Sequence, residues 1–404
     1  MPRYQYVAIN SAGKKIKGTV EDQNEEAAMQ QIKRKGEFPV EIKEETILNK
    51  DINLPFLDRI KPRDFSTFCW QMKSILAAGV SIVPALEMLT AQTGNKKLRS
   101  ALVGVKSDVE KGESFSEALM RQNKVFPEMM ISMVKAGEAS GSLETSLERL
   151  AVHFEKDGKL KSIVKKAMMY PCILICVIII VMAVLLTFVI PSFSATFAEM
   201  DMEMPALTQA VIGISDAVTK YWYLFIAGAV LLVVAIKLFS KTDRGRHVFG
   251  WLAIKVPLFG AVTTRSASAK FCRTLSTLLG AGLSVMDSLE ITAENMTNVY
   301  FREAVEMVRA EAAKGTSMSK ALEASGIFPV MVYHMMGVGE ETGEIEEMLE
   351  KVADYFDEEV ENSTQALTAA MEPAIICVMA VIVGVLVASI LMPMMSMYDG
   401  IQNL

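Results

Sequence analysis

The chain has 404 residues, of which 51% are hydrophobic and 22% are charged, a combination that predicts membrane-spanning helices joined to water-exposed domains. Its formal net charge of -6 excludes the basic surface that nucleic-acid binding requires. The five cysteines form no CxxC pair, so the spacing indicates neither a zinc site nor a disulfide framework.

Residues 1–45 predict a small α+β module. Residues 4–9 and 16–21 alternate like strands around a turn at 10–13. Residues 24–35 predict a helix stopped by Gly36, and residues 38–42 predict a third strand. The polar, proline-containing residues 46–62 predict a linker.

Residues 63–170 predict a domain built from helices. Apolar residues recur there at helical spacing, as in Leu98, Ala101, Leu102, Val105 and Val109. Ser114 and Glu117 have the spacing of a capping box at the start of the next helix. A long helix is expected to begin near residue 143 and to continue into the membrane.

Three stretches predict membrane spans: residues 171–190, 222–239 and 373–392. A helix of 20 apolar residues rises about 30 Å, the thickness of the hydrocarbon core. Four prolines mark the predicted boundaries, and the first and third are expected to kink the helix at the membrane surface. They are Pro171, Pro191, Pro373 and Pro393.

Basic residues predict how the spans are oriented. Five lysines precede the first span and four basic residues follow the second, whereas no Lys or Arg follows the third. The connector at residues 191–221 is acidic, with Lys220 its only basic residue. We therefore expect a cytoplasmic N-terminus, with the connector and the tail at residues 393–404 outside the cytoplasm.

An internal repeat explains this layout. Residues 68–81 align with residues 271–284 at an offset of 203, which pairs Gly79 with Gly282. Downstream, Gly137-Glu138-Ala-Ser-Gly141 aligns with Gly339-Glu340-Glu-Thr-Gly343 at an offset of 202. Two copies of one helical domain are therefore expected, at residues 63–170 and 240–372. Both copies precede a span of the same direction, so the middle span must return the chain.

The two Gly-Glu-x-x-Gly segments, Gly137–Gly141 and Gly339–Gly343, predict tight helix junctions. The first glycine of each, Gly137 or Gly339, is expected to end a helix with positive φ, and the second is expected to keep the turn tight. Glu138 and Glu340 are expected to cap free amides at the start of the following helix.

Catalytic motifs are absent from the sequence. It contains no GxxxxGK[ST] phosphate loop, no HExxH pair and no GxSxG elbow. The first and third spans hold no ionisable group, which argues against an ion-coupled transporter. The sequence thus favours a scaffold; a transporter or channel and a membrane-bound enzyme are the alternatives from other classes.

These features resemble the bacterial type II secretion system F protein family, which includes the platform proteins of type IV pili. The resemblance rests on the segments at Gly79–Glu87 and Gly282–Glu290, on the Gly-Glu turns, and on the residues around Pro171 and Pro191. It implies a platform in the bacterial cytoplasmic (inner) membrane, acting in pilus assembly or, alternatively, in type II secretion.

The resemblance also implies partners and a cation. The partners would be a hexameric cytoplasmic assembly ATPase, pilin or pseudopilin subunits, other inner-membrane assembly proteins and a second copy of the chain. No catalytic residue and no organic cofactor is implied. Some family members suggest a divalent cation near the cytoplasmic domain, for which Glu87 and Glu138 would be the ligands.

Overall fold

The computed structural model describes residues 3–9, 15–22, 24–34, 38–44, 59–122, 125–193, 206–257 and 259–402. The chain divides into two compact units, Met1–Arg59 and Ile60–Leu404. The described strands all belong to the first unit, and the described part of the second unit is helical. This is the predicted fold class, a helical membrane protein with a small N-terminal α+β module.

The first unit is an antiparallel sheet covered by one helix. Strands β1 (Arg3–Ile9), β2 (Lys15–Glu21) and β3 (Phe38–Glu44) have the order β2-β1-β3, and α1 spans Glu25–Arg34. Tyr4, Tyr6 and Ala8 point to one face of β1 because side chains alternate along a strand. They are buried with Ala28 and Ile32 of α1. The predicted turn at residues 10–13 and most of the predicted linker lie outside the described residues.

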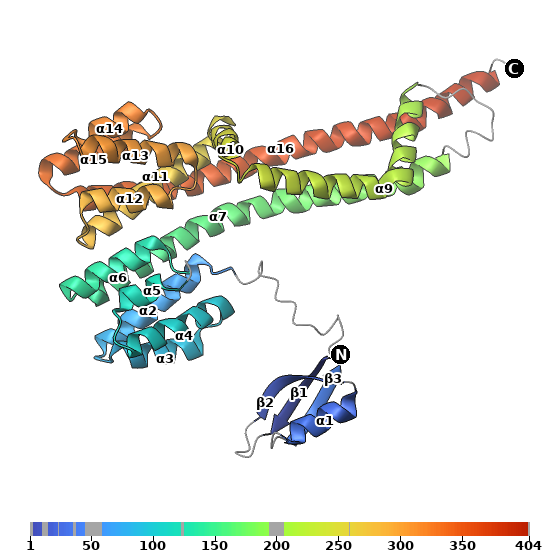
Figure 1. The fold of residues 1–404 in the computed structure, drawn as a ribbon. Helices are drawn as coiled ribbons and strands as arrows, with labels where there is room; N and C mark the ends of the chain where they lie inside the picture. Colours follow the sequence, from blue (N-terminus) through green and yellow to red (C-terminus); the bar gives the residue numbers. More distant parts are fainter. Residues whose placement is uncertain are drawn as a thin grey trace. The chain divides into compact units, whose positions relative to one another are not determined.

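The second unit contains the same succession of helices twice (Figure 1). The first copy comprises α2 (Pro62–Ala77), α3 (Ile82–Gln92), α4 (Lys96–Glu110), α5 (Phe115–Met120), α6 (Glu128–Ser140) and α7 (Leu143–Val184). The second comprises α11 (Phe259–Gly280), α12 (Val285–Asn295), α13 (Val299–Ala312), α14 (Met318–Ser325), α15 (Val330–Thr342) and α16 (Ile345–Gln402), preceded by α10 (Asp243–Lys255). The duplication predicted from the sequence is therefore present in the fold.

Local sequence explains where these helices begin. The Asn95 side chain accepts a 3.0 Å hydrogen bond from the amide of Leu98 at the start of α4. From there Leu98, Leu102 and Val105 recur at helical spacing and are buried. The apolar face predicted for this helix is thus the face that packs into the domain.

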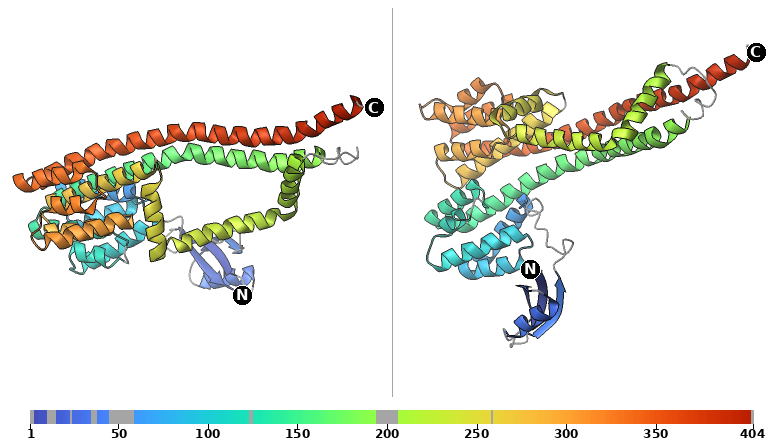
Figure 2. Two further views of the ribbon diagram at one scale, coloured as in Figure 1. Left: turned by 90° about the horizontal axis from the view of Figure 1, so that it is seen from above. Right: turned by 45° about the vertical axis from the view of Figure 1, so that its right-hand side comes forward.

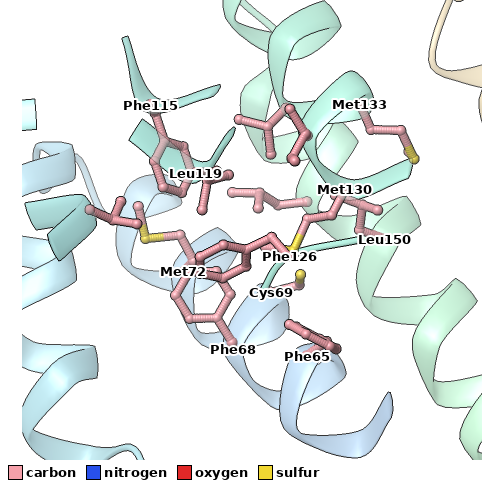
Figure 3. Close-up of a cluster of buried hydrophobic side chains, with 14 of the residues drawn as sticks. Phe65, Phe68, Cys69, Met72, Phe115, Leu119, Phe126, Met130, Met133 and Leu150 are labelled. Atoms are coloured by element: carbon pink, nitrogen blue, oxygen red, sulfur yellow. The ribbon is translucent and has the colours of Figure 1, made fainter. Parts of the chain in front are cut away.

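Each copy has its own apolar core, and each core takes in residues of the other copy. Figure 3 shows the first core, where aromatic and methionine side chains of α2 and α6 meet α5 and α7. Leu278 of α11 and Ile291 of α12 belong to this first core although they come from the second copy. Leu160 of α7, from the first copy, belongs to the second core. The two copies are therefore one packed structure.

Three described helices are long and apolar enough to cross a membrane. They are α7 with its continuation to Phe193, α9 (Ala206–Phe239) and α16. Helices α7 and α16 run side by side away from the domains, and α9 leads back to α10 (Figures 1 and 2). Helices α10 and α11 could together form a fourth span, but that span would be broken by a sharp bend between the two helices. That arrangement conflicts with the burial of Phe271 and Leu275 of α11 in the second core.

The boundary prolines do not end the helices. Helix α7 continues through Pro171, and α16 continues through Pro373 and Pro393 to Gln402. The first span passes through a π-helical segment, η1 (Leu185–Val189), and past Pro191 to Phe193. A transmembrane helix tolerates proline because neighbouring helices and local π geometry satisfy the backbone groups that it frees. Where the membrane begins and ends along these helices stays a prediction.

Residues 206–220, assigned by the sequence to the connector, form the first part of α9. The helix bends at Tyr221, whose φ of -117° is not helical. Before the bend, Val211 is buried with Leu186 of η1 and Leu386 of α16. The Thr208 hydroxyl also donates a 2.9 Å hydrogen bond to the carbonyl of Ser389. This segment therefore ties the far ends of α7 and α16 together.

Candidate functional site: the domain junctions and the two long helices

The carboxylates of the two Gly-Glu turns cap helices that precede them. Glu138 accepts hydrogen bonds from the amides of Phe115 (2.6 Å) and Ser116 (2.9 Å), which open α5. The prediction that Glu138 caps the following helix is therefore wrong. An amide at a helix start needs an acceptor, and here tertiary packing brings one from 23 residues downstream in the sequence. The Ser114 hydroxyl adds a third acceptor, 3.2 Å from the amide of Glu117, so one half of the predicted capping box is present.

Glu340 repeats this arrangement in the second copy. It accepts hydrogen bonds from the amides of Met318 (2.6 Å) and Ser319 (3.1 Å) and from the hydroxyl of Ser317 (2.6 Å). Burial acts to raise the pKa of Glu340, but the bonds from Ser317, Ser319 and Met318 outweigh it and lower that pKa. Glu340 is therefore a fixed anion at the start of α14, and Glu138 makes the equivalent hydrogen bonds at the start of α5.

The glycines of these turns have two different functions. Gly141 and Gly343 end α6 and α15 with φ of 72° and 79°, the left-handed conformation that favours glycine. Gly137 and Gly339 lie inside the helices, so the prediction that they end them with positive φ is wrong. A Cβ at position 339 would stand 2.7 Å from the Cα of Ile345. Glycine is needed there because α15 touches the backbone of α16, as α6 touches the start of α7.

Glu87 and its repeat partner Glu290 each form an ion pair. Glu87 of α3 lies 3.2 Å from the ammonium of Lys106 on α4. The second copy reproduces it: Glu290 lies 2.9 Å from the guanidinium of Arg309. Each pair joins the second and third helices of its copy (α3 to α4, α12 to α13). Gly79 and Gly282, with φ of 81° and 82°, make the turns that lead into α3 and α12.

Glu87 and Glu138 do not fit a shared divalent-cation site. A lysine partners the carboxylate of Glu87, and backbone amides occupy both oxygens of Glu138. A calcium site needs six to eight oxygen ligands. In the part of the chain that the structure describes, no three His, Cys, Asp or Glu side chains are grouped to hold a metal.

Ion pairs connect the two long helices where these helices form part of the domains. The ammonium of Lys156 on α7 lies 3.0 Å from Asp354 on α16, and Arg149 of α7 pairs with Glu346 of α16. A Cβ at Gly280, at the end of α11, would overlap both Arg149 and Glu346. The ion pair between Arg149 and Glu346 therefore requires glycine at position 280, where any side chain would occupy the same space.

Family comparison agrees with this duplicated geometry. The model of the type II secretion system protein F domain matches residues 68–191 and 271–393. The model of that protein's N-terminal domain matches residues 1–43. The chain belongs to the type II secretion system protein F family. Its two matched domains coincide with the two series of helices described above.

Relatives of this F-family chain carry two kinds of name. It is 35% identical to the type IV pilus assembly protein PilC of Myxococcus xanthus, over 99% of this chain and 96% of the relative. It is 36% identical to the PilC of Thermus thermophilus, over 98% of each chain. It is also 30% identical to the type II secretion system protein F of Vibrio cholerae, over 98% of each.

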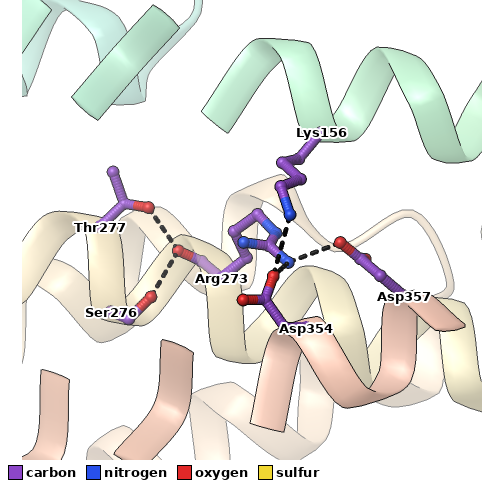
Figure 4. A network of polar contacts seen from close by, with 6 residues as sticks. All are labelled: Lys156, Arg273, Ser276, Thr277, Asp354 and Asp357. Carbon is purple, nitrogen blue, oxygen red and sulfur yellow. Dashed lines mark hydrogen bonds and ion pairs between the residues drawn. The ribbon is translucent and has the colours of Figure 1, made fainter. Parts of the chain in front are cut away.

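The second copy also contains a buried charge that the sequence analysis did not single out. Arg273 of α11 is 8% exposed and donates to Asp357 (2.6 Å) and Asp354 (3.0 Å) of α16, beside Lys156 (Figure 4). The alignment of the copies pairs Arg273 with Trp70, whose indole donates a 3.2 Å hydrogen bond to Glu155. In the alignment of the two copies, an arginine stands where the other copy has a tryptophan. This difference was the sequence signal that could have revealed the buried charge.

Proposed function

We propose that this protein is a membrane platform for type IV pilus assembly, which couples a cytoplasmic hexameric ATPase to the insertion or extraction of pilin subunits. The chain contains no phosphate loop, so the work of ATP hydrolysis has to come from a partner. The names of relatives matched over nearly full length support the pilus assignment. We further infer that the chain acts as a homodimer with other inner-membrane assembly proteins.

The observation that carries this proposal is the direct mechanical link between domain and membrane. Each helical domain continues into its span through one helix, of 51 residues in the first copy and 48 up to Met392 in the second. Such helices are roughly 70–75 Å long and stiff along their axes. Because ion pairs join α7 to α16, a rotation of the domains would turn both spans together.

The platform of a type II secretion system is the second candidate, since a relative of that name matches 98% of the chain. Expression of this chain in strains lacking either platform separates the two. Restored pili without restored secretion supports the first candidate, and the reverse supports the second.

Position-specific crosslinking tests the coupling proposal. A photoreactive amino acid at Ile180 or Val381, 62% and 66% exposed on the spans, should capture pilin. The same amino acid at Val103 of α4 or Val330 of α15, both exposed on the domains, should capture the ATPase. Captured proteins are identified by mass spectrometry from piliated cells.

Buried neighbours supply the matched controls for this experiment. Leu386 in the third span and Leu102 in α4 are buried, so the photoreactive group there should capture neither partner. If pilin were captured equally from the domains and from the spans, the proposal that the spans contact pilin and the domains contact the ATPase would be contradicted. Capture of neither partner in cells that still make pili would refute the coupling proposal.

The orientation of the chain is the second expected result. With the domains in the cytoplasm, an alkaline phosphatase fused after Leu404 should be active, because that enzyme folds only outside the cytoplasm. A fusion at residue 242, in the turn that joins α9 to α10, should be inactive, as the basic residues around that turn predict. Activity in the reverse pattern would overturn the predicted orientation of the spans.

A further inference from the structure

A pocket of about 1160 Å³ lies where the second copy meets α7 and the start of α10. Its wall on α7 includes Leu160, Val164 and Met168, which recur every four residues and so form one helix face. Met168 precedes the first apolar span by three residues, and Ser240, on another wall, follows the last residue of α9. The pocket is therefore bounded by the domain-side ends of two membrane spans.

The charge of the pocket is opposite to that of the chain. Five basic side chains and three carboxylates line it, a net charge of +2 with His247 neutral, whereas the whole chain carries -6. The basic residues are Lys161, Lys165, Arg246, Lys270 and Arg302, and the carboxylates are Asp157, Asp243 and Glu303.

Every carboxylate of the pocket already has a partner. Asp157 lies 2.6 Å from Lys161 on the same helix. Asp243 lies 3.7 Å from Arg246 and Glu303 lies 2.8 Å from His247. The backbone bond to Asp243 and the bond to Glu303 raise the pKa of His247.

Three cations of the pocket are left without a carboxylate in the part of the chain described. Lys270 is partly buried, and this burial lowers its pKa, while the charge of Asp157 opposes the shift. Arg302 donates one hydrogen bond, of 3.1 Å, to the carbonyl of Met296, while its Nε is buried without a partner. Lys165 is exposed on the α7 wall. A partly buried cation without a carboxylate partner is costly, so Lys270 and Arg302 favour the binding of an anion beside them.

We propose that this pocket binds the phosphate headgroup of an anionic phospholipid from the leaflet that faces the helical domains. Basic pockets between membrane helices at this depth are suited to such headgroups. Lys270, Arg302 and Lys165 hold the phosphate, and the apolar α7 face with Phe249 of α10 covers the glycerol and the first acyl carbons. The lipid thereby joins α7 to α10 and α13 at the membrane surface.

Native mass spectrometry of the full chain tests the proposal. Protein purified in mild detergent is titrated with phosphatidylglycerol or phosphatidylcholine, and the bound lipid is counted. We expect one tight site for phosphatidylglycerol and none for phosphatidylcholine. Lys165→Gln and Lys270→Met should each weaken the tight site about fivefold, the effect of one basic charge near a membrane surface.

Lys166→Gln is the matched control, because Lys166 neighbours Lys165 on α7 but does not line the pocket. It should leave the tight site unchanged. Lys165 is exposed, so its replacement tests the site without disturbing the fold. Equal binding of phosphatidylglycerol by the Lys165→Gln, Lys270→Met and Lys166→Gln variants would overturn the proposal. Full displacement of the lipid by millimolar inorganic phosphate would also overturn it, in favour of a free-phosphate site.

Discussion

Arg273→Met is expected to destabilise the protein by about 3–5 kcal/mol, the usual cost of removing one partner from a buried ion pair. The guanidinium of Arg273 is the cation closest to Asp357, 2.6 Å away, and the Asp357 carboxylate is itself little exposed. Burial already raises the pKa of Asp357, and Arg273 is the first of the charges that oppose this shift. Without Arg273 the carboxylate would stay desolvated between α11 and α16, with only the charge of Lys156 left to oppose its burial.

Thermal unfolding in detergent, followed by tryptophan fluorescence, measures this effect. A second variant, Arg273→Met with Asp357→Leu, replaces the whole pair by apolar side chains and should recover most of the loss. Lys156→Gln serves as the control, since Lys156 is more than one third exposed and its pair with Asp354 should contribute less than about 1 kcal/mol. A double variant as unstable as the single one would show that the buried pair is not the cause.

Gly339→Ala is expected to destabilise the junction of α15 with α16 by about 1–3 kcal/mol, although alanine is the better helix former. The added Cβ would stand 2.7 Å from the Cα of Ile345 and 3.2 Å from its backbone nitrogen. Backbone atoms cannot rotate away as a flexible side chain can, so one helix has to move. The first turn of α16 would shift relative to its own domain.

Gly337→Ala is the matched control on the same helix. A Cβ there would meet only the Ser319 side chain, at an ordinary 3.4 Å, and helix propensity should stabilise the protein by up to about 1 kcal/mol. Unfolding temperature and membrane level are measured for both variants. If the two alanines have the same effect, close approach of the helices is not what requires Gly339.

Features that depend on neighbours in sequence could be predicted. The spans follow from runs of apolar residues, and the start of α5 at Ser114 follows from a local cap. The repeat required only an alignment of the chain with itself. Even the order of strands and helix in the N-terminal module agrees with the alternation and turn signals.

Features that depend on tertiary packing could not be predicted. Glu138 and Gly137 are adjacent, yet one caps a helix more than 20 residues upstream and the other faces Ser146 of α7. The first part of α9 carries mixed polar and apolar residues, and its burial against η1 and α16 becomes apparent only when three distant segments are placed together. The cations of the lipid pocket likewise come from four different helices.

Leu278 and Ile291 of the second copy belong to the first core, so the first domain cannot complete its core until the ribosome has translated part of the second copy. The last residue that the first copy itself contributes to that core is Phe154, and Ile291 follows it by 137 residues. Translation proceeds at about 5–20 residues per second, so roughly 7 to 27 s pass between the synthesis of Phe154 and that of Ile291. During that interval two spans have to be inserted, because the membrane-spanning part of α7 and the whole of α9 lie between the two positions. A defect in the insertion of α9 would therefore appear first as misfolding of a domain translated earlier.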